Sequence, residues 1–189
     1  MKKIIPIAIF ACLTSLSINA IAAEQTVSIG YAQTKVDDFK DIKGVNLQYL
    51  YETDSLPVGI VVSTSYMSGK KTERDSISFE DTTVNFDTKA KIKYFSLLAG
   101  PSYSFNEYVS AYGLLGFAHT KLNVDAYLSD PQINLSDKES KTSFAYGVGL
   151  SLNPIENVAV NVGYEGTHAK YDGDKIKFNG FNIGVGYTF

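Results

Sequence analysis

Large apolar residues alternate with small or polar ones along the last ten residues of the chain. The apolar positions are Phe181, Ile183, Val185, Tyr187 and Phe189, and a glycine, asparagine or threonine stands before each of them. Successive side chains of a β-strand point to opposite faces, so a period of two residues predicts a strand. This strand has one large apolar face and one small or polar face.

Seven earlier segments repeat the alternation. They lie at residues 27–32, 44–52, 58–66, 91–103, 109–121, 143–152 and 158–165. In segment 109–121 two sets of apolar residues compete, because Leu115 and Phe117 occupy one face while Tyr112 and Leu114 occupy the other. The pattern therefore leaves the outward face of this segment undecided. Together the eight segments predict an all-β protein.

The connectors between these segments fall into two length classes that alternate along the chain. Short turns rich in Asn, Asp and Pro lie at 54–57, 105–107 and 153–156. Longer polar connectors lie near 34–43, 69–90, 122–141 and 171–175. Bacterial outer-membrane barrels have short turns on the periplasmic side and longer loops outside. The chain is therefore expected to form an eight-stranded antiparallel transmembrane up-and-down β-barrel, with the four longer connectors as extracellular loops.

A soluble β-sandwich or barrel alternates in the same way, so the composition of the second face decides between the classes. A soluble barrel exposes charged residues, whereas here the second face consists of Gly, Ala, Ser, Thr and Asn with few charges. Such residues fit the narrow interior of an eight-stranded barrel, which side chains nearly fill. The large apolar face is then expected to contact lipid, and a water-filled pore is not expected.

The first 22 residues have the features of a secretory signal peptide. Met1-Lys2-Lys3 is basic, residues 4–18 are mostly apolar, and small residues lead up to Ala22. We expect cleavage after Ala22, which leaves one domain over residues 23–189, and cleavage after Ala23 is the alternative. That domain has no cysteine, because the only one lies in the signal, and this excludes disulfides and thiolate metal ligands. The net charge of −3 argues against a nucleic-acid partner.

Six motifs are spread from the first predicted strand to the last. They are GYAQ at 30–33, NLQYLYETDSLPVG at 46–59, AGPSYSFNEYVSAYGLLG at 99–116, FAYGVGLSLNPIENVAV at 144–160, YE at 164–165 and FNIGVGYTF at 181–189. In these motifs the chain resembles the OmpX/Ail/PagC/Lom family of small Gram-negative outer-membrane proteins. The resemblance implies an integral barrel of the outer membrane, with Phe189 resembling the signal read by the barrel assembly machinery. The roles of family members range from adhesion, invasion and complement resistance to envelope stress.

Two carboxylates fall on the small, inward face, at Glu52 and Glu165. An unpaired buried carboxylate is costly, so both need hydrogen-bond partners or water. One interpretation is a titratable pair that controls a pore. The other, which the dense Gly and Ser lining favours, is an interior polar network.

Six cations gather where the second long connector leaves and rejoins the barrel. They are Lys70, Lys71, Arg74, Lys89, Lys91 and Lys93. Antiparallel pairing brings both groups to one rim, where they could bind lipopolysaccharide phosphates or sulfated host glycans. Five acidic residues lie among them, so a solvated loop with internal ion pairs is the alternative. The acidic residues are Glu73, Asp75, Glu80, Asp81 and Asp87.

The favoured interpretation is a non-enzymatic surface protein of Ail type, whose loops mediate adhesion or serum resistance. Host matrix proteins, sulfated glycans and complement regulators are the expected partners, besides outer-membrane lipid. The alternative is a structural or envelope-stress barrel of OmpX type without a dedicated ligand. A lipid-A modifying enzyme is less favoured, because no motif joins His119 or His168 to a nucleophile. No cofactor or metal is expected.

Overall fold

The computed structural model describes residues 23–36, 41–53, 56–79, 82–129, 132–171 and 174–189, so the predicted signal peptide lies outside it. Within the two longest hairpins, only the backbone is described for 73–79, 82–87, 126–129 and 132–136. Helices long and apolar enough to span a membrane do not occur in the described residues.

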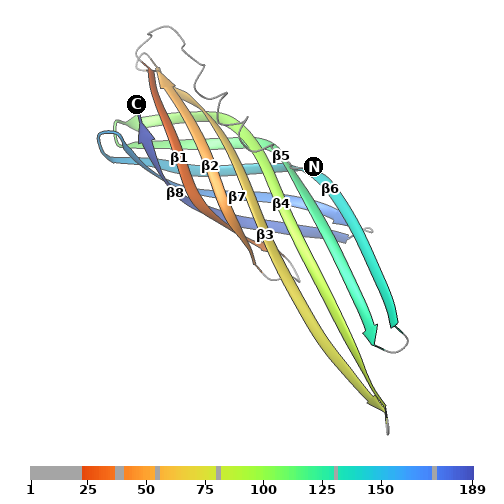
Figure 1. The fold of residues 1–189 in the computed structure, drawn as a ribbon. Coiled ribbons are helices and arrows are strands. Elements are labelled where there is room, and N and C mark those ends of the chain that lie inside the picture. Colours follow the sequence, from red (N-terminus) through yellow and green to blue (C-terminus); the bar gives the residue numbers. More distant parts are fainter. Residues whose placement is uncertain (1–22, 37–40, 54–55, 80–81, 130–131, 172–173) are drawn as a thin grey trace, which may run out of the picture.

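Eight antiparallel strands close into one barrel, in which each strand pairs with its neighbours in sequence and β1 pairs with β8. The strands are β1 (Ala23–Val36), β2 (Ile42–Thr53), β3 (Leu56–Phe79), β4 (Thr82–Asn106), β5 (Val109–Ser129), β6 (Gln132–Ile155), β7 (Val158–Tyr171) and β8 (Asp174–Thr188). The predicted fold class is therefore confirmed. Figure 1 shows the tilted strands, with the short turns and the C-terminus at one end.

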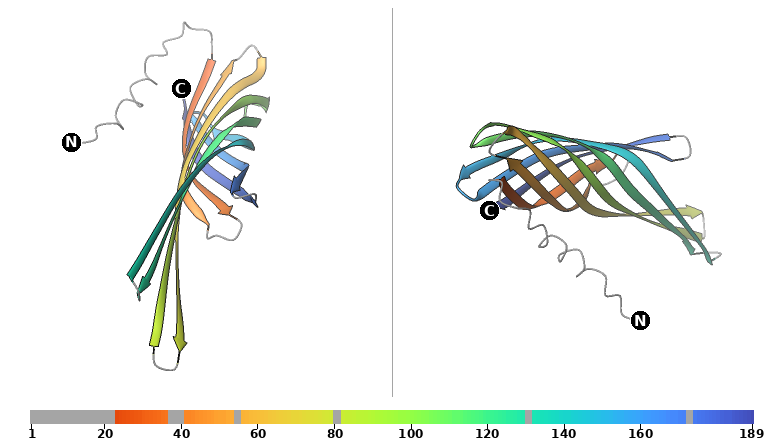
Figure 2. Two further views of the ribbon diagram at one scale, coloured as in Figure 1. Left: turned by 90° about the vertical axis from the view of Figure 1, so that its right-hand side faces the viewer. Right: turned by 90° about the horizontal axis from the view of Figure 1, so that it is seen from above.

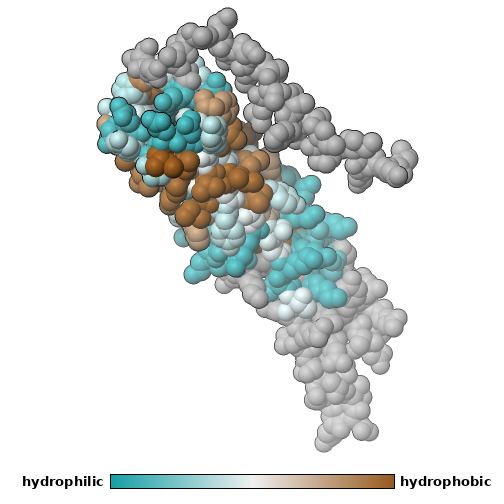
Figure 3. All heavy atoms as spheres, turned by 60° about the vertical axis from the view of Figure 1, so that its left-hand side comes forward, coloured by the Kyte–Doolittle hydropathy of each residue, from teal (hydrophilic) through white to brown (hydrophobic). Residues whose placement is uncertain are grey.

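The alternation along each strand separates an outward apolar face from a buried inner face. The exposed apolar residues include Ile29, Leu47, Ile60, Leu97, Phe117, Val148, Val162 and Val185. They form a band around the barrel, and Figure 3 shows this band on one face, with hydrophilic residues on either side of it. Closure pairs the backbone of every strand within the band, which a lipid environment requires.

The alternation left the outward face of β5 undecided, and the glycines of β6 decide it. Tyr112 pairs with Gly149 and Leu114 pairs with Gly147, and both large side chains are buried in the lumen. A Cβ atom at Gly149 would lie 2.3 Å from the Tyr112 hydroxyl, so the glycine makes the room that the tyrosine needs. Leu115 and Phe117 consequently face lipid.

The strands differ in length, because β3 to β6 have 21–25 residues and the others have 12–15. The pairing of β2 with β3 stops at Lys43 and Ser68, and that of β6 with β7 stops at Ala145 and Thr167. Beyond these pairs β3 to β6 continue as a four-stranded sheet, which Figures 1 and 2 show leaving the barrel as two long hairpins.

We call this part, residues 69–79, 82–92, 122–129 and 132–139, the projecting sheet. The segments expected as loops 69–90 and 122–141 thus consist largely of paired strands, because their backbones keep hydrogen-bonding across β4 and β5. Since short turns mark the periplasmic end of such barrels, we expect the projecting sheet to lie on the extracellular side.

Two glycines on opposite faces of the wall provide a test of the crowded interior. A Cβ atom at the inward Gly44 would lie 1.9 Å from the carbonyl oxygen of Tyr66, whereas one at the outward Gly113 would meet nothing within 4 Å. We expect Gly44→Ala to destabilise the barrel by about 1–3 kcal/mol, as overpacked sites do. Gly113→Ala should leave the urea midpoint of the refolded barrel unchanged. Equal midpoints for the two variants would contradict a filled lumen.

Candidate functional site

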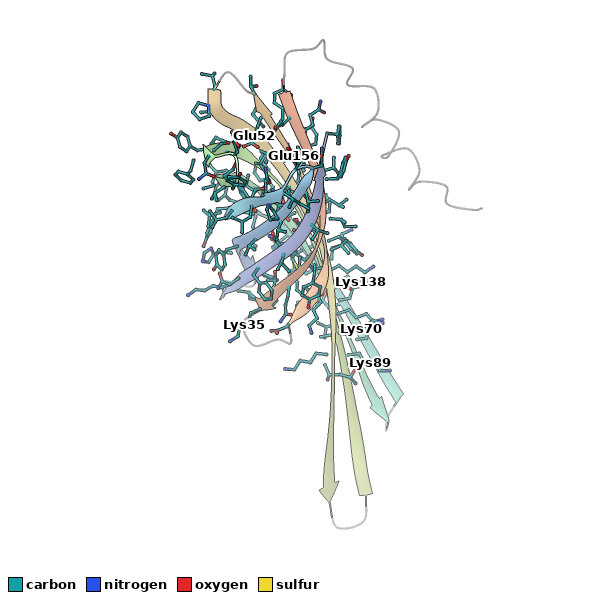
Figure 4. All side chains as sticks on the ribbon, turned by 90° about the vertical axis from the view of Figure 1, so that its left-hand side faces the viewer. Lys35, Glu52, Lys70, Lys89, Lys138 and Glu156 are labelled. Carbon is teal, nitrogen blue, oxygen red and sulfur yellow. The ribbon has the colours of Figure 1, made fainter. Side chains whose placement is uncertain are left out.

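Four of the predicted cations share the outer face of the sheet at the extracellular rim. Lys70 of β3 pairs with Lys91 of β4, and Lys93 and Lys89 lie two residues to either side of Lys91. All four side chains are exposed. We call Lys70, Lys89, Lys91 and Lys93 the lysine face, and Figure 4 shows Lys70 and Lys89 at the end of the barrel from which the hairpins project.

The other two predicted cations do not join this face. Lys71 is half-buried and alternates to the inner face, opposite Ala90. The backbone of Arg74 pairs with that of Asp87, but their side chains lie outside the described residues. The ion pairs expected with the five acidic residues of this hairpin also fall outside them.

Among the cations at this rim that the sequence alone did not predict is one directly opposite Lys93. Lys121 of β5 is exposed and pairs with Lys93 of β4. Lys121 lies on the same face of β5 as the lipid-facing Phe117, four residues earlier. The sequence could not place it there, because it left the outward face of this segment undecided.

Two directly opposed like-charge pairs occur here: Lys70 and Lys91 within the lysine face, and Lys93 of that face with Lys121 of β5. Like charges directly opposite each other on antiparallel strands are destabilising. Among the described residues no ion pair neutralises Lys70, Lys91 or Lys93, whereas Lys141 lies 3.1 Å from Glu139. The arrangement therefore favours anions that bind between the opposed lysines.

Glu165 lies in the lumen and is hydrogen-bonded within a polar network. It is 7% exposed and accepts hydrogen bonds from the Tyr94 hydroxyl at 2.5 Å and from Ser65 Oγ at 3.2 Å. Asn46 in turn donates to Ser65 Oγ at 3.1 Å. The ring of Tyr94 stacks on Phe178 at 5.8 Å, which holds its hydroxyl toward the carboxylate. These contacts supply the partners that a buried carboxylate needs.

Glu52 occupies a separate site near the periplasmic turns. It accepts hydrogen bonds from Ser104 Oγ at 2.5 Å and Ser110 Oγ at 3.0 Å. Both serines and Glu24 line a cavity of about 530 Å³ at this end. The structure therefore gives Glu52 and Glu165 different partners and does not bring them together as a pair.

An apolar cluster fills the lumen at the opposite, extracellular end. It contains Val36, Ile42, Met67, Ile92 and Phe178, each at most 5% exposed. The lumen is therefore mixed, because polar networks surround Glu52 and Glu165, while buried apolar side chains fill this end and continue toward the middle with Val61 and Leu98.

The histidines lie outside the lumen. His119 Nδ1 lies 2.9 Å from Thr142 Oγ1 on the outer side, and the exposed His168 pairs in register with Lys177. The buried Glu165 is on the other face of β7. Within the described residues, no group of three or more His, Cys, Asp or Glu side chains is placed to hold a metal ion.

Comparison with known proteins matches most of the chain to outer-membrane β-barrel proteins. The model of the outer membrane protein beta-barrel domain family matches residues 8–189. Virulence membrane protein PagC of Salmonella typhimurium is 40% identical, with all of both chains covered. The attachment invasion locus protein of Yersinia enterocolitica is 37% identical, with 100% of this chain and 99% of the relative covered.

A solved structure with the same architecture is that of Ail, the attachment invasion locus protein of Yersinia pestis, in complex with the heparin analogue sucrose octasulfate. It is 35% identical and superposes with a TM-score of 0.69, covering 88% of this chain and 99% of Ail.

The interior network generates a prediction about stability. Tyr94→Phe removes the hydroxyl that donates to Glu165, and leaving a buried hydrogen-bonding group without a partner costs about 1–3 kcal/mol. We expect a correspondingly lower urea midpoint for this variant. The control is Tyr112→Phe, which removes a second buried hydroxyl of the lumen that is not a hydrogen-bond partner of Glu165. Equal losses in the two variants would mean that the contact with Glu165 contributes nothing.

Proposed function

Since this chain belongs to the outer membrane β-barrel family that includes PagC and Ail, we propose that it is a non-enzymatic surface protein whose extracellular end binds polyanions. The binding serves adhesion to host surfaces or resistance to serum complement, as expected for the Ail type. The observation that carries this proposal is the opposition of like charges at the lysine face, where among the described residues no ion pair neutralises Lys70, Lys91 or Lys93.

The spacing of the lysines supports a ligand with repeated negative charges. Directly opposed side chains such as Lys70 and Lys91 have Cβ atoms about 5 Å apart. Lys89, Lys91 and Lys93 follow each other along one face of β4, at intervals of about 7 Å. A sulfated glycan carries several charges at comparable separations and contacts several lysines at once. The sucrose octasulfate bound to Ail is a ligand of this chemistry.

The two lysine pairs lie at different heights above the membrane. Lys93 is followed on the outer face of β4 by Phe95, which is 46% exposed and begins the lipid-facing band. Lys93 and Lys121 are thus suited to phosphates of lipopolysaccharide at the membrane surface. Lys70 and Lys91 lie one outward position farther from the membrane and remain available to host glycans.

The projecting sheet also offers backbone groups to protein partners. β3 loses its β2 partner after Ser68, and β6 has its first β7 partner only at Ala145. Each edge therefore presents unpaired N–H and C=O groups to water, and an extended segment of a matrix protein or complement regulator can add to such an edge.

The separation of the titratable groups supports a non-enzymatic role. Acid–base catalysis needs the acid and the base within hydrogen-bonding reach of one substrate. Here Glu165 is in the lumen, whereas His119 and His168 lie outside the wall. The alternative, a structural barrel of OmpX type without a dedicated ligand, would show none of the binding predicted below.

Neutralising the lysine face tests the polyanion proposal. We expect the triple variant Lys70→Gln, Lys91→Gln, Lys93→Gln to bind heparin about tenfold more weakly, since three exposed ionic contacts contribute about 0.5 kcal/mol each. The matched control is Lys35→Gln with Lys177→Gln, which removes exposed lysines from β1 and β8. The measurement is the heparin dissociation constant of barrels in nanodiscs at several salt concentrations. Equal affinities for both variants would contradict a specific lysine face.

Shortening the first projecting hairpin tests the adhesion proposal. Replacing residues 73–88 by Asn-Gly keeps Thr72 opposite Lys89 and closes them with a two-residue turn. We expect cells that express this variant to lose binding to host matrix and survival in serum, while the heat-modifiable gel mobility of the barrel is retained. The control shortens the second hairpin, with Asn-Gly in place of residues 125–136 between the paired Val124 and Asp137. If cells with the shortened first hairpin kept wild-type adhesion and serum survival, this result would contradict the proposal.

A further inference from the structure

The lipid-facing wall is interrupted by a groove between β4 and β5, near the periplasmic end. The groove has a volume of about 410 Å³, and the outward residues that line it are Val58, Pro101, Tyr103, Ala111 and Gly113. These residues present apolar groups and one phenol, and no charge. The groove is distinct from the lysine face and from the cavity beside Glu52.

Two features of the sequence produce the groove. Proline has no N–H to donate to a neighbouring strand. Ala99 of β4 pairs with Leu115 of β5, and Ser102 pairs with Tyr112. Between these pairs, Pro101 and Gly113 are not paired with each other. In addition, β5 has only Ala111 and Gly113 on its outer face here, and a Cβ at Gly113 would meet nothing within 4 Å. The space is therefore left by missing side chains in a wall otherwise covered by large ones.

The position of the groove determines which lipid lies against it. The outward residues of β4 run from Leu97 through Ala99 and Pro101 to Tyr103 and Phe105, next to the turn at Asn106. The groove thus lies between the hydrocarbon band and the aromatic residues of the periplasmic rim. In an outer membrane that leaflet consists of glycerophospholipid, whereas lipopolysaccharide occupies the other leaflet.

We propose that this groove binds one acyl chain of a periplasmic-leaflet glycerophospholipid, as a discrete site rather than as part of the bulk bilayer. An unfilled space would forfeit dispersion contacts along its walls, and a flexible acyl chain restores them. Tyr103 forms one side of the site, and its ring packs edge-on against Phe105 at 5.3 Å. Its hydroxyl lies at the level where lipid ester groups accept hydrogen bonds, as is usual for tyrosines of an aromatic girdle.

Filling the groove tests the proposal. Gly113→Leu places a side chain in the open space, while Ala99→Leu adds the same side chain to the exposed outer face of β4 outside the groove. Barrels released from nanodiscs of phosphatidylethanolamine are analysed by native mass spectrometry. We expect one retained phospholipid on the wild type and on Ala99→Leu, and a retained fraction about tenfold lower on Gly113→Leu.

Three results would overturn the proposed acyl-chain site. They are no retained phospholipid on the wild type, retention by Gly113→Leu equal to that of the wild type, or equal loss of phospholipid from both variants. A dimer that only Gly113→Leu abolishes would instead assign the groove to a second copy of the chain. Far-ultraviolet circular dichroism and heat-modifiable mobility confirm that each variant is folded.

A second measurement does not depend on the folding of Gly113→Leu. The chain has no tryptophan, so Phe105→Trp introduces a single reporter beside the groove, against Tyr103, and Phe117→Trp introduces one on the open lipid face. In detergent micelles with a small fraction of brominated phosphatidylethanolamine, we expect the Phe105→Trp variant to be quenched several times more strongly than the Phe117→Trp variant. Equal quenching of the two reporters would show that the groove has no preference for phospholipid.

Discussion

The structure depends on one constraint, which is that backbone N–H and C=O groups within a bilayer must find partners in the protein itself. The chain meets it by closing eight strands on one another, with β8 returning to pair with β1. Closure at eight strands leaves a lumen barely wide enough for side chains. This explains why glycine and serine line it and why Tyr94 and Tyr112 lie beside glycines or small polar residues.

Outside the membrane the same constraint no longer applies, because water can pair with an exposed strand edge. The four longest strands therefore continue beyond the barrel as a sheet, and no further strand pairs with its two outer edges on β3 and β6. The result is an open sheet, presented by a rigid wall, that carries charge on its outer face. A loop of the same length would have to lose conformational entropy before it could offer such an array of lysines to a ligand.

The two ends and the wall of the barrel thus have different chemistry. The extracellular end combines an apolar cluster in the lumen with the lysine face outside, and the periplasmic end contains the hydrogen-bonded Glu52. The wall between them is covered by large apolar side chains, except at the groove beside Pro101 and Gly113. The residues that we propose for polyanion binding are consequently separate from those that we propose for phospholipid binding.

The sequence by itself determined the strands, their two faces, the alternation of short and long connectors and hence the barrel, because period-two alternation and turn residues are local properties. It also predicted that Lys70 and Lys91 meet at one rim, since a hairpin must bring its two arms together. Only the tertiary structure decided that Lys93 is opposed by Lys121, that Lys71 faces inward and that Tyr112 enters the lumen. These facts depend on the register between neighbouring strands, which is set by the packing of large side chains against glycines across the closed barrel.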